Sequence, residues 1–250
     1  MTKVVFAACL LVAISWAAPT ALAKDPTQLM LRKGARVGII NLMDAEVTQF
    51  HASKVLAQSF LKTHPVKWQV DSMLSDAVTQ RLTQLELVPV AVGPSDTLML
   101  SRDELFVNNS VAKGLPREAS KDFGDLAAAN RLDAMIVLAP GLNNSAQAGN
   151  LLRKALPDYL RGWGFVTSDT NDKPSLFNMT QVLLIGTGPK GCVLDAREWG
   201  GAYAEDWTDY VAPENPKQMP PEQLDHLQPV FSKILAQQTG RLMEWITVSP

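Results

Sequence analysis

The clearest change of hydrophobic period along the chain lies within Leu115–Leu142. Up to Asn130 the pattern predicts a helix, and six consecutive apolar residues then run over Ala134–Ala139 before Pro140. An uninterrupted apolar run of this length is typical of a central strand that is covered on both faces. The stretch therefore predicts a helix followed by a buried strand.

Three further elements follow from patterns in the N-terminal half. A short apolar run over Arg36–Leu42 predicts the first strand, and apolar residues at three- and four-residue steps in Val70–Leu85 predict a helix with one face on a sheet. Leu87–Val92 predicts a second strand, and Pro89 places it at a sheet edge or marks the start of the strand, because proline cannot donate to the ladder. Ala45–Lys67 fits neither period, so its structure stays open.

The middle of the chain offers shorter signals. Ser101–Glu104 has the spacing of a capping box, which predicts a helix from Arg102 to about Ala112. Leu151–Leu156 is amphipathic, Phe165–Thr167 favours a short strand, and Asp169–Pro174 favours a polar surface turn.

The C-terminal part begins with two β-type runs, Met179–Ile185 and Cys192–Trp199. They flank the glycine-rich Gly186–Gly191, which predicts a hairpin. The tail over Glu222–Ile246 predicts a helix, in which Pro229 either causes a kink or marks the true first turn.

These elements predict an α/β fold, with α+β as the alternative, built on a mixed sheet of about five or six strands with helices on its faces. We expect a removable signal peptide over residues 1–23 and an α/β domain over 24–211. A proline-rich connector over 212–221 and a C-terminal helix over 222–250, packed on the domain, complete the expected organisation.

The first residues have the features of a secretory signal. Lys3 precedes an apolar run over Val4–Ala18, and Ala21–Ala23 provides small residues for cleavage after Ala23. The run is too short for a good membrane span. The sequence therefore predicts a protein without an integral membrane segment after cleavage, located in the periplasm or secreted.

Charge and cysteine content narrow the function classes. The chain has 23 basic and 25 acidic residues and a net charge of −2, a balance that favours neither nucleic acid nor an anionic membrane surface as a partner. Cys9 lies in the signal region, so Cys192 remains alone and forms no internal disulfide. Between a turn and an apolar strand, Cys192 is expected to be a buried, inert thiol.

Motifs for cofactors and metals are weak. Gly186–Gly191 matches the G-x-G-x-x-G pattern, but β-type residues follow it where a dinucleotide site needs a helix, so we predict a hairpin turn and no cofactor. The three histidines do not pair at a metal-binding spacing. A metal site from Asp44, Glu46 and His51 requires the loop after the first strand to fold back, and a plain polar surface is the preferred interpretation.

One acidic group is a catalytic candidate. Glu205, Asp206 and Asp209 lie among aromatic residues, and paired carboxylates flanked by aromatics suit carbohydrate chemistry. The preferred interpretation is that the aromatics anchor a loop on the domain.

A binding groove is the other candidate site. If the strands over Arg36–Leu42 and Ala134–Ala139 lie parallel and adjacent, their carboxyl ends meet at the edge where open α/β sheets usually bind ligands. The residues there offer hydrogen bonds rather than an acid–base pair, and helix caps and turns are the alternative role. The candidate binding residues are Asn41, Asp44, Gly141, Asn143 and Asn144.

The order of elements resembles a group of bacterial envelope domains, the TolB amino-terminal and CsgG-like family. The corresponding units are a strand ending in a polar turn, a helix leading to a strand, a helix entering an alanine–aspartate–strand unit, and a glycine hairpin. They correspond to Val37–Asp44, Asp71–Val92, Leu126–Leu138 and Gln181–Trp199. Asn143–Asn178 is longer than in that family. The resemblance implies a periplasmic protein that binds envelope proteins or supports their assembly.

The sequence therefore favours an exported accessory protein that acts by protein–protein contact in the cell envelope, with no catalytic activity evident from its residues. Two alternatives stay open. One is an exported hydrolase of a cell-wall or carbohydrate substrate that uses the acidic group, and the other is a periplasmic binder of a small ligand that uses the strand-end groove.

Overall fold

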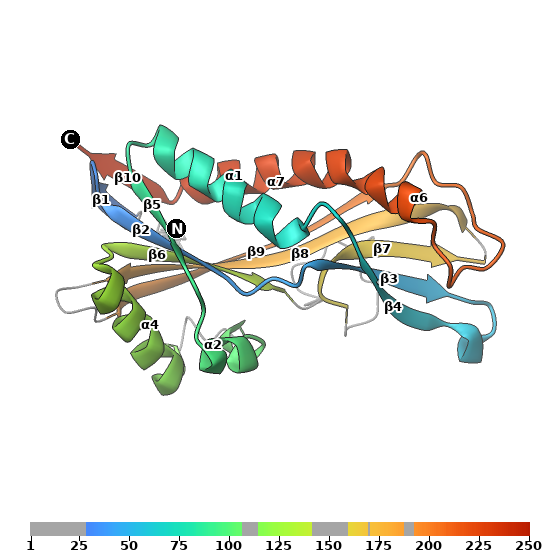
Figure 1. The fold of residues 1–250 in the computed structure, drawn as a ribbon, viewed down its shortest axis with the longest axis horizontal. Helices are drawn as coiled ribbons and strands as arrows, with labels where there is room; N and C mark the ends of the chain where they lie inside the picture. The colour runs from blue at the N-terminus through green and yellow to red at the C-terminus, as the bar shows by residue number, and fades with distance from the viewer. Residues whose placement is uncertain (1–28, 107–114, 142–159, 170, 188–192) are drawn as a thin grey trace, which may run out of the picture.

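The chain folds into one long mixed sheet with helices on both faces (Figure 1). The computed structural model describes residues 29–106, 115–141, 160–169, 171–187 and 193–250. Its strands are β1 (Leu29–Arg32), β2 (Arg36–Asn41), β3 (Glu46–Ala52), β4 (Phe60–Pro65), β5 (Val88–Val92), β6 (Ala134–Pro140), β7 (Gly162–Ser168), β8 (Asn171–Thr187), β9 (Val193–Asp206) and β10 (Ile246–Ser249).

The helices pack on opposite faces of this sheet. In Figure 1, α1 and α7 lie along one face, and α2 and α4 lie beneath one end of the other face. None of the helices in the described ranges is long and apolar enough to cross a membrane. The α-helices are α1 (Val70–Gln84), α2 (Asp96–Ser101), α4 (Arg117–Asn130), α6 (Pro221–Asp225) and α7 (Leu227–Met243), and the 3₁₀ turns are Leu56–Gln58 and Glu104–Phe106.

The long strand β8 organises the sheet. One edge of β8 pairs antiparallel with β7 and then with β6, end to end, and the other edge pairs antiparallel with β9. β6 lies parallel to β2, and β7 lies parallel to β3. We call β5, β2, β6 and their part of β8 the β6 half, and β4, β3, β7 and their part of β8 the β7 half.

The fold is α/β, as predicted. β2 and β6 lie parallel and adjacent, which is the condition on which the predicted groove depends. Both of these strands and α4 lie where the hydrophobic patterns place them. The sheet has eight strands, which is more than expected, and β1 and β10 form a separate parallel pair. The undecided segment Ala45–Lys67 contains the antiparallel β3–β4 hairpin.

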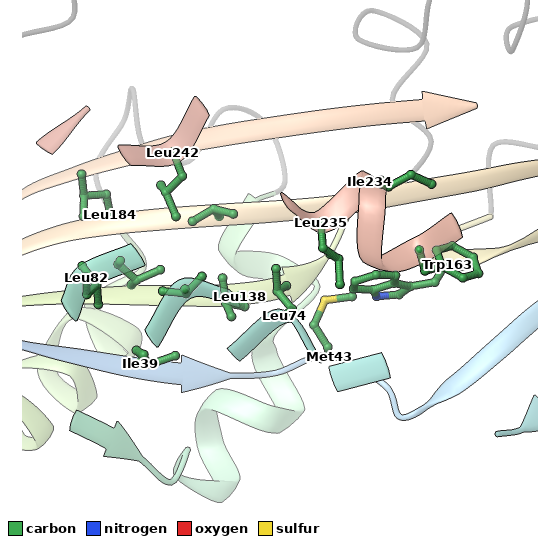
Figure 2. Packing of buried hydrophobic residues seen from close by; sticks show 14 of the residues in the cluster. Ile39, Met43, Leu74, Leu82, Leu138, Trp163, Leu184, Ile234, Leu235 and Leu242 are labelled. Carbon is green, nitrogen blue, oxygen red and sulfur yellow. The ribbon is translucent and has the colours of Figure 1, made fainter. Parts of the chain in front are cut away.

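The core has a layer on each face of the β6 half. All seven residues of β6 are buried, as a strand covered on both faces requires. Figure 2 shows one layer, in which side chains from the sheet meet those of α1 and α7. Each fully buried leucine stabilises the fold by about 1.5–3 kcal/mol. The labelled residues of that layer are Ile39, Met43, Leu74, Leu82, Leu138, Trp163, Leu184, Ile234, Leu235 and Leu242.

The capping-box prediction is wrong. Ser95, not Ser101, is the N-cap: its hydroxyl accepts a hydrogen bond from the Leu98 N–H at 3.1 Å, so α2 begins at Asp96. Ser101 ends α2, and its hydroxyl donates back to Thr97 O. Only the 3₁₀ turn over Glu104–Phe106 follows, and the rest of the expected helix lies outside the described residues, as does the amphipathic Leu151–Leu156.

The C-terminal segments also differ in detail from the predictions. The surface turn expected over Asp169–Pro174 is wrong in its extent, because β8 already begins at Asn171. β8 and β9 form the predicted hairpin, although both strands are longer than expected. The C-terminal helix is divided into α6 and α7, and Pro229 lies in the first turn of α7, where a missing N–H costs no helical hydrogen bond.

Close approach of β3 to β7 generates a stability prediction. A Cβ on Gly164 would lie 1.9 Å from the backbone oxygen of Thr48 and 2.6 Å from the Phe177 ring, whereas nothing lies within 4 Å of the equivalent position on Gly240. We expect Gly164→Ala to lower the free energy of unfolding by at least about 1–3 kcal/mol. Gly240→Ala, within α7, should raise it by about 0.5–1 kcal/mol. Urea unfolding of both variants checks this, and equal effects would contradict the packing of β3 on β7.

Candidate functional site

The strand-end site lies where β2 passes into β3. Asn41 uses its whole amide there: Nδ2 donates to Asp71 O at 2.9 Å and to Ser75 Oγ at 3.1 Å, and Oδ1 accepts from the Met43 N–H at 3.0 Å. These bonds tie the end of β2 to the first turns of α1. Asn41 therefore holds the turn and the helix in place, which is the alternative role considered for it.

Asp44 is held by an arginine that was not predicted as part of the site. Arg102, at the end of α2, donates through Nη2 to Asp44 Oδ1 at 2.7 Å and through Nη1 to Leu42 O at 2.8 Å. The Arg102 side chain is 14% exposed and that of Asp44 is 44% exposed, so solvent screens the pair from the carboxylate side. The contact joins α2 to the junction of the two halves.

A second ion pair joins the turn after α2 to the sheet. Arg161, immediately before β7, pairs with Asp103 through Nη1 and Oδ2. Gly141, immediately after β6, donates to Met179 O at 2.6 Å and accepts from the Gly162 N–H at 3.2 Å, so β6 and β7 meet end to end on β8. The junction of the two halves is thus crossed by backbone bonds and by two charge pairs.

The structure brings together only part of the predicted groove. Asn41 and Gly141 follow adjacent parallel strands, as expected, but their polar groups bond within the protein. Asn143 and Asn144 lie outside the described residues. Ligand binding at this edge therefore stays a prediction.

A buried polar network in the β7 half was missed by the sequence reasoning. His51 Nε2 donates to Asp169 Oδ1 at 3.0 Å, and its Nδ1 lies 2.9 Å from Thr167 Oγ1. Thr167 Oγ1 also accepts from Gln49 Nε2 at 3.2 Å. In the neutral ring, Nδ1 accepts the threonine proton, so the bonds run in one direction from Gln49 to Asp169.

Ser53 completes this network at the ends of β3 and β7. Its hydroxyl donates to Asp169 Oδ2 at 2.6 Å, and the Lys54 N–H donates to the same oxygen at 3.2 Å. These bonds lower the pKa of Asp169, with the serine making the largest contribution. Nucleophilic catalysis requires a serine bonded to the histidine, whereas Ser53 bonds to the carboxylate. The arrangement therefore clamps two strand ends.

His64 extends the network to β4. Gln49 Nε2 also donates to the Pro216 carbonyl at 3.0 Å, which fixes the orientation of the amide, so Gln49 Oε1 accepts from His64 Nε2 at 2.8 Å. His64 is 5% exposed and stacks on Phe165. Burial, and secondarily the positive charge of Lys62, lower the pKa of His64 to about 4.

The metal hypothesis is wrong for these residues. Asp44 pairs with Arg102, and His51 pairs with Asp169 at the far end of β3 from Glu46. Successive strand residues rise about 3.3 Å, so Glu46 and His51 are too far apart to bind one ion. Across the described ranges, no group of three potential metal-binding side chains is present.

The acidic group lies at the end of β9 and in the loop after it. Asp206 and Asp209 are exposed, and Asp209 Oδ1 accepts from Thr208 Oγ1 at 2.6 Å. Trp207 between them is buried, with its ring 5.3 Å from Phe165. Trp207 therefore anchors this loop, as the preferred interpretation requires. The structure describes the backbone of Glu205 but not its side chain, so a catalytic role for Glu205 stays a prediction.

The neighbouring aromatic residue Tyr210 also packs in this loop. Its ring lies 5.2 Å from that of Trp207, and burial raises the pKa of its hydroxyl.

No sequence signal links the missed residues. His51 and Asp169 are separated by 118 positions, and Asp44 and Arg102 by 58. Only the pairing of β3 with β7, and the return of α2 under the sheet, bring them together.

The histidine at the end of the network generates a pH prediction. The unfolded chain protonates His64 below about pH 6.5, whereas the folded protein does so only near pH 4. Stability from the neutral ring is therefore complete above pH 6.5 and falls as the pH drops toward 4, by at most about 1.4 kcal/mol per pH unit. Asp169, whose pKa is lowered from 3.8, loses its contribution only at lower pH.

Urea unfolding between pH 7 and pH 4.5 measures this slope. His64→Gln keeps a donor toward Gln49 and should remove the His64 part of the slope. His226→Gln, at an exposed position, is the matched control and should leave the slope unchanged. Parallel loss of stability in wild type and His64→Gln would contradict the assignment.

Comparisons with known proteins add little to this geometry. No protein-family model and no curated protein matches the chain. Among solved structures, it is similar to the crystal structure of protein XCC0632 from Xanthomonas campestris, described with the family model DUF330. The TM-score is 0.38 at 11% identity, over 89% of this chain and 86% of that chain. A likeness of this size carries no conclusion about function, and the resemblance to the TolB amino-terminal and CsgG-like family stays a prediction.

Proposed function

We propose that this protein is an exported accessory protein of the cell envelope that acts by contact with a partner protein. The contact surface is the outer edge of β9, to which an extended segment of the partner adds as a further strand. The observation that supports this is the length and openness of that edge.

β9 is 14 residues long and pairs with β8 along most of its length. Within the described parts of the chain, no strand pairs with its other edge. In an antiparallel strand, roughly half of the backbone N–H and C=O groups point away from a given neighbour. A row of unpaired backbone N–H and C=O groups along an edge is a template for a partner strand, as in strand-addition complexes.

The other edge strands differ from β9 in ways that oppose strand addition. β4 and β5 have six and five residues and contain Pro65 and Pro89, respectively. Lys62 of β4 also donates from Nζ to the Lys217 carbonyl. Short length, proline and lysine are the usual protection of an edge. β9 contains neither proline nor lysine over its whole length.

Export is the part of the proposal that depends on the sequence. The basic residue, apolar run and small residues before Lys24 form the signal-peptide pattern, and an envelope location is where such a protein meets its partner. The loop that follows β9 is anchored by the buried Trp207, so the end of the edge strand is fixed on the domain.

Site-specific photocrosslinking in cells that naturally produce the protein tests the proposal. A photoreactive residue replaces Ala196, Ala202 or Ala204 on β9, and the control positions are the exposed Gln80 and Thr83 on α1. We expect β9 positions to capture one defined envelope protein in the periplasmic fraction and α1 positions to capture none. Capture that is equal from both elements, or absent from β9, would contradict the proposal.

A further inference from the structure

A polar depression lies at the opposite end of the parallel strands from the predicted groove, where β2 and β6 begin. Its volume is about 550 Å³. It is formed by the turn after β1, the start of β2, the segment between α4 and β6, and the end of β8. The residues that line it are Arg32, Gly34, Arg36, Arg131, Leu132, Asp133 and Thr187.

Positive charge dominates this depression. Three arginines and one aspartate line it, which gives a local excess of cations in a chain whose net charge is −2. Asp133 is already engaged, because its Oδ2 accepts from the backbone N–H of Arg36 at 2.8 Å. A concave surface of one charge sign concentrates ions of the opposite sign.

Arg36 has a structural role that the other two arginines do not share. Its Nε and Nη2 lie 3.4 Å and 3.3 Å from Asn130 O, the last residue of α4, and so satisfy the carbonyl end of the helix. Arg32 and Arg131 are exposed. Neither guanidinium has an ion pair or a hydrogen-bond partner among the described residues.

The backbone at Arg131 supports a role for its side chain. This residue has φ 53° and ψ 54°, the left-handed conformation in which helices usually end on glycine or asparagine. An arginine there costs conformational energy that glycine would avoid. Helix termination therefore does not explain why a long cation occupies this position.

We propose that the depression is a binding site for a phosphate-type oxyanion, held by the guanidinium groups of Arg32 and Arg131. Guanidinium donors match the geometry of phosphate oxygens and bind them through charge-assisted hydrogen bonds. Arg36 also lines the depression, and its guanidinium stays bound to the carbonyl end of α4. The phosphate belongs either to a soluble phosphorylated molecule or to the head group of an anionic phospholipid.

Two binding measurements on the full mature chain distinguish these sources. Calorimetric titration with inorganic phosphate and glycerol phosphate tests the soluble source, and co-sedimentation with phosphatidylglycerol vesicles, compared with phosphatidylcholine vesicles, tests the lipid source. Saturable binding in either arm supports the site. Absence of saturable binding to the soluble phosphates, together with no preference for phosphatidylglycerol over phosphatidylcholine vesicles, would overturn it.

Variants separate binding from folding. The double variant Arg32→Gln with Arg131→Gln should weaken binding at least about tenfold, as expected for loss of charged hydrogen bonds. The control Arg81→Gln removes an exposed cation on α1 and should change the affinity less than about twofold. Arg131→Gly should raise the melting temperature by relieving the left-handed strain and yet weaken binding. Retained binding in Arg131→Gly would overturn the proposal. All these variants leave β9 unchanged, so the result is independent of the partner contact.

Discussion

The backbone hydrogen bonds along β8 are the constraint on which the rest of the structure depends. This strand has 17 residues. By contrast, the chain leaves the sheet between β2 and β3, and again between β6 and β7. Among the strands that the structure describes, only β8, with β9 beside it, runs continuously through both halves. The ion pairs of Arg102 and Arg161 and the amide of Asn41 hold the chain in place where it leaves the sheet. The polar residues at the junction therefore stabilise the sheet.

Apolar packing stabilises both halves, and the β7 half adds a buried polar network. The β6 half has apolar layers on both faces, as the continuous apolar run over Ala134–Ala139 predicts. In the β7 half, one face contains the chain of polar groups from His64 through Gln49 to His51, closed by Asp169. A buried network of this kind is stable only when each member is satisfied. At its end, burial and secondarily the charge of Lys62 keep the pKa of His64 low.

Sequence reasoning predicted the elements whose burial is periodic and local. It located β2, α4, β6 and the β8–β9 hairpin, because each depends on neighbouring residues. It missed the start of α2, where the N-cap is Ser95, whose hydroxyl also donates to Asp122 of α4, 27 residues away in the chain. It also missed the His51–Asp169 contact and the arginine depression, because these depend on residues far apart in sequence that the sheet brings together.

Native-state hydrogen exchange along β8 tests most directly whether this strand unites the molecule. The amides of Phe177, opposite Gly164 of β7, and of Leu184, opposite Ile136 of β6, report on the two halves. A single cooperative unit predicts that both exchange only through global unfolding, with the same free energy and the same dependence on denaturant. Exchange of one half at a clearly lower free energy than the other would contradict the account.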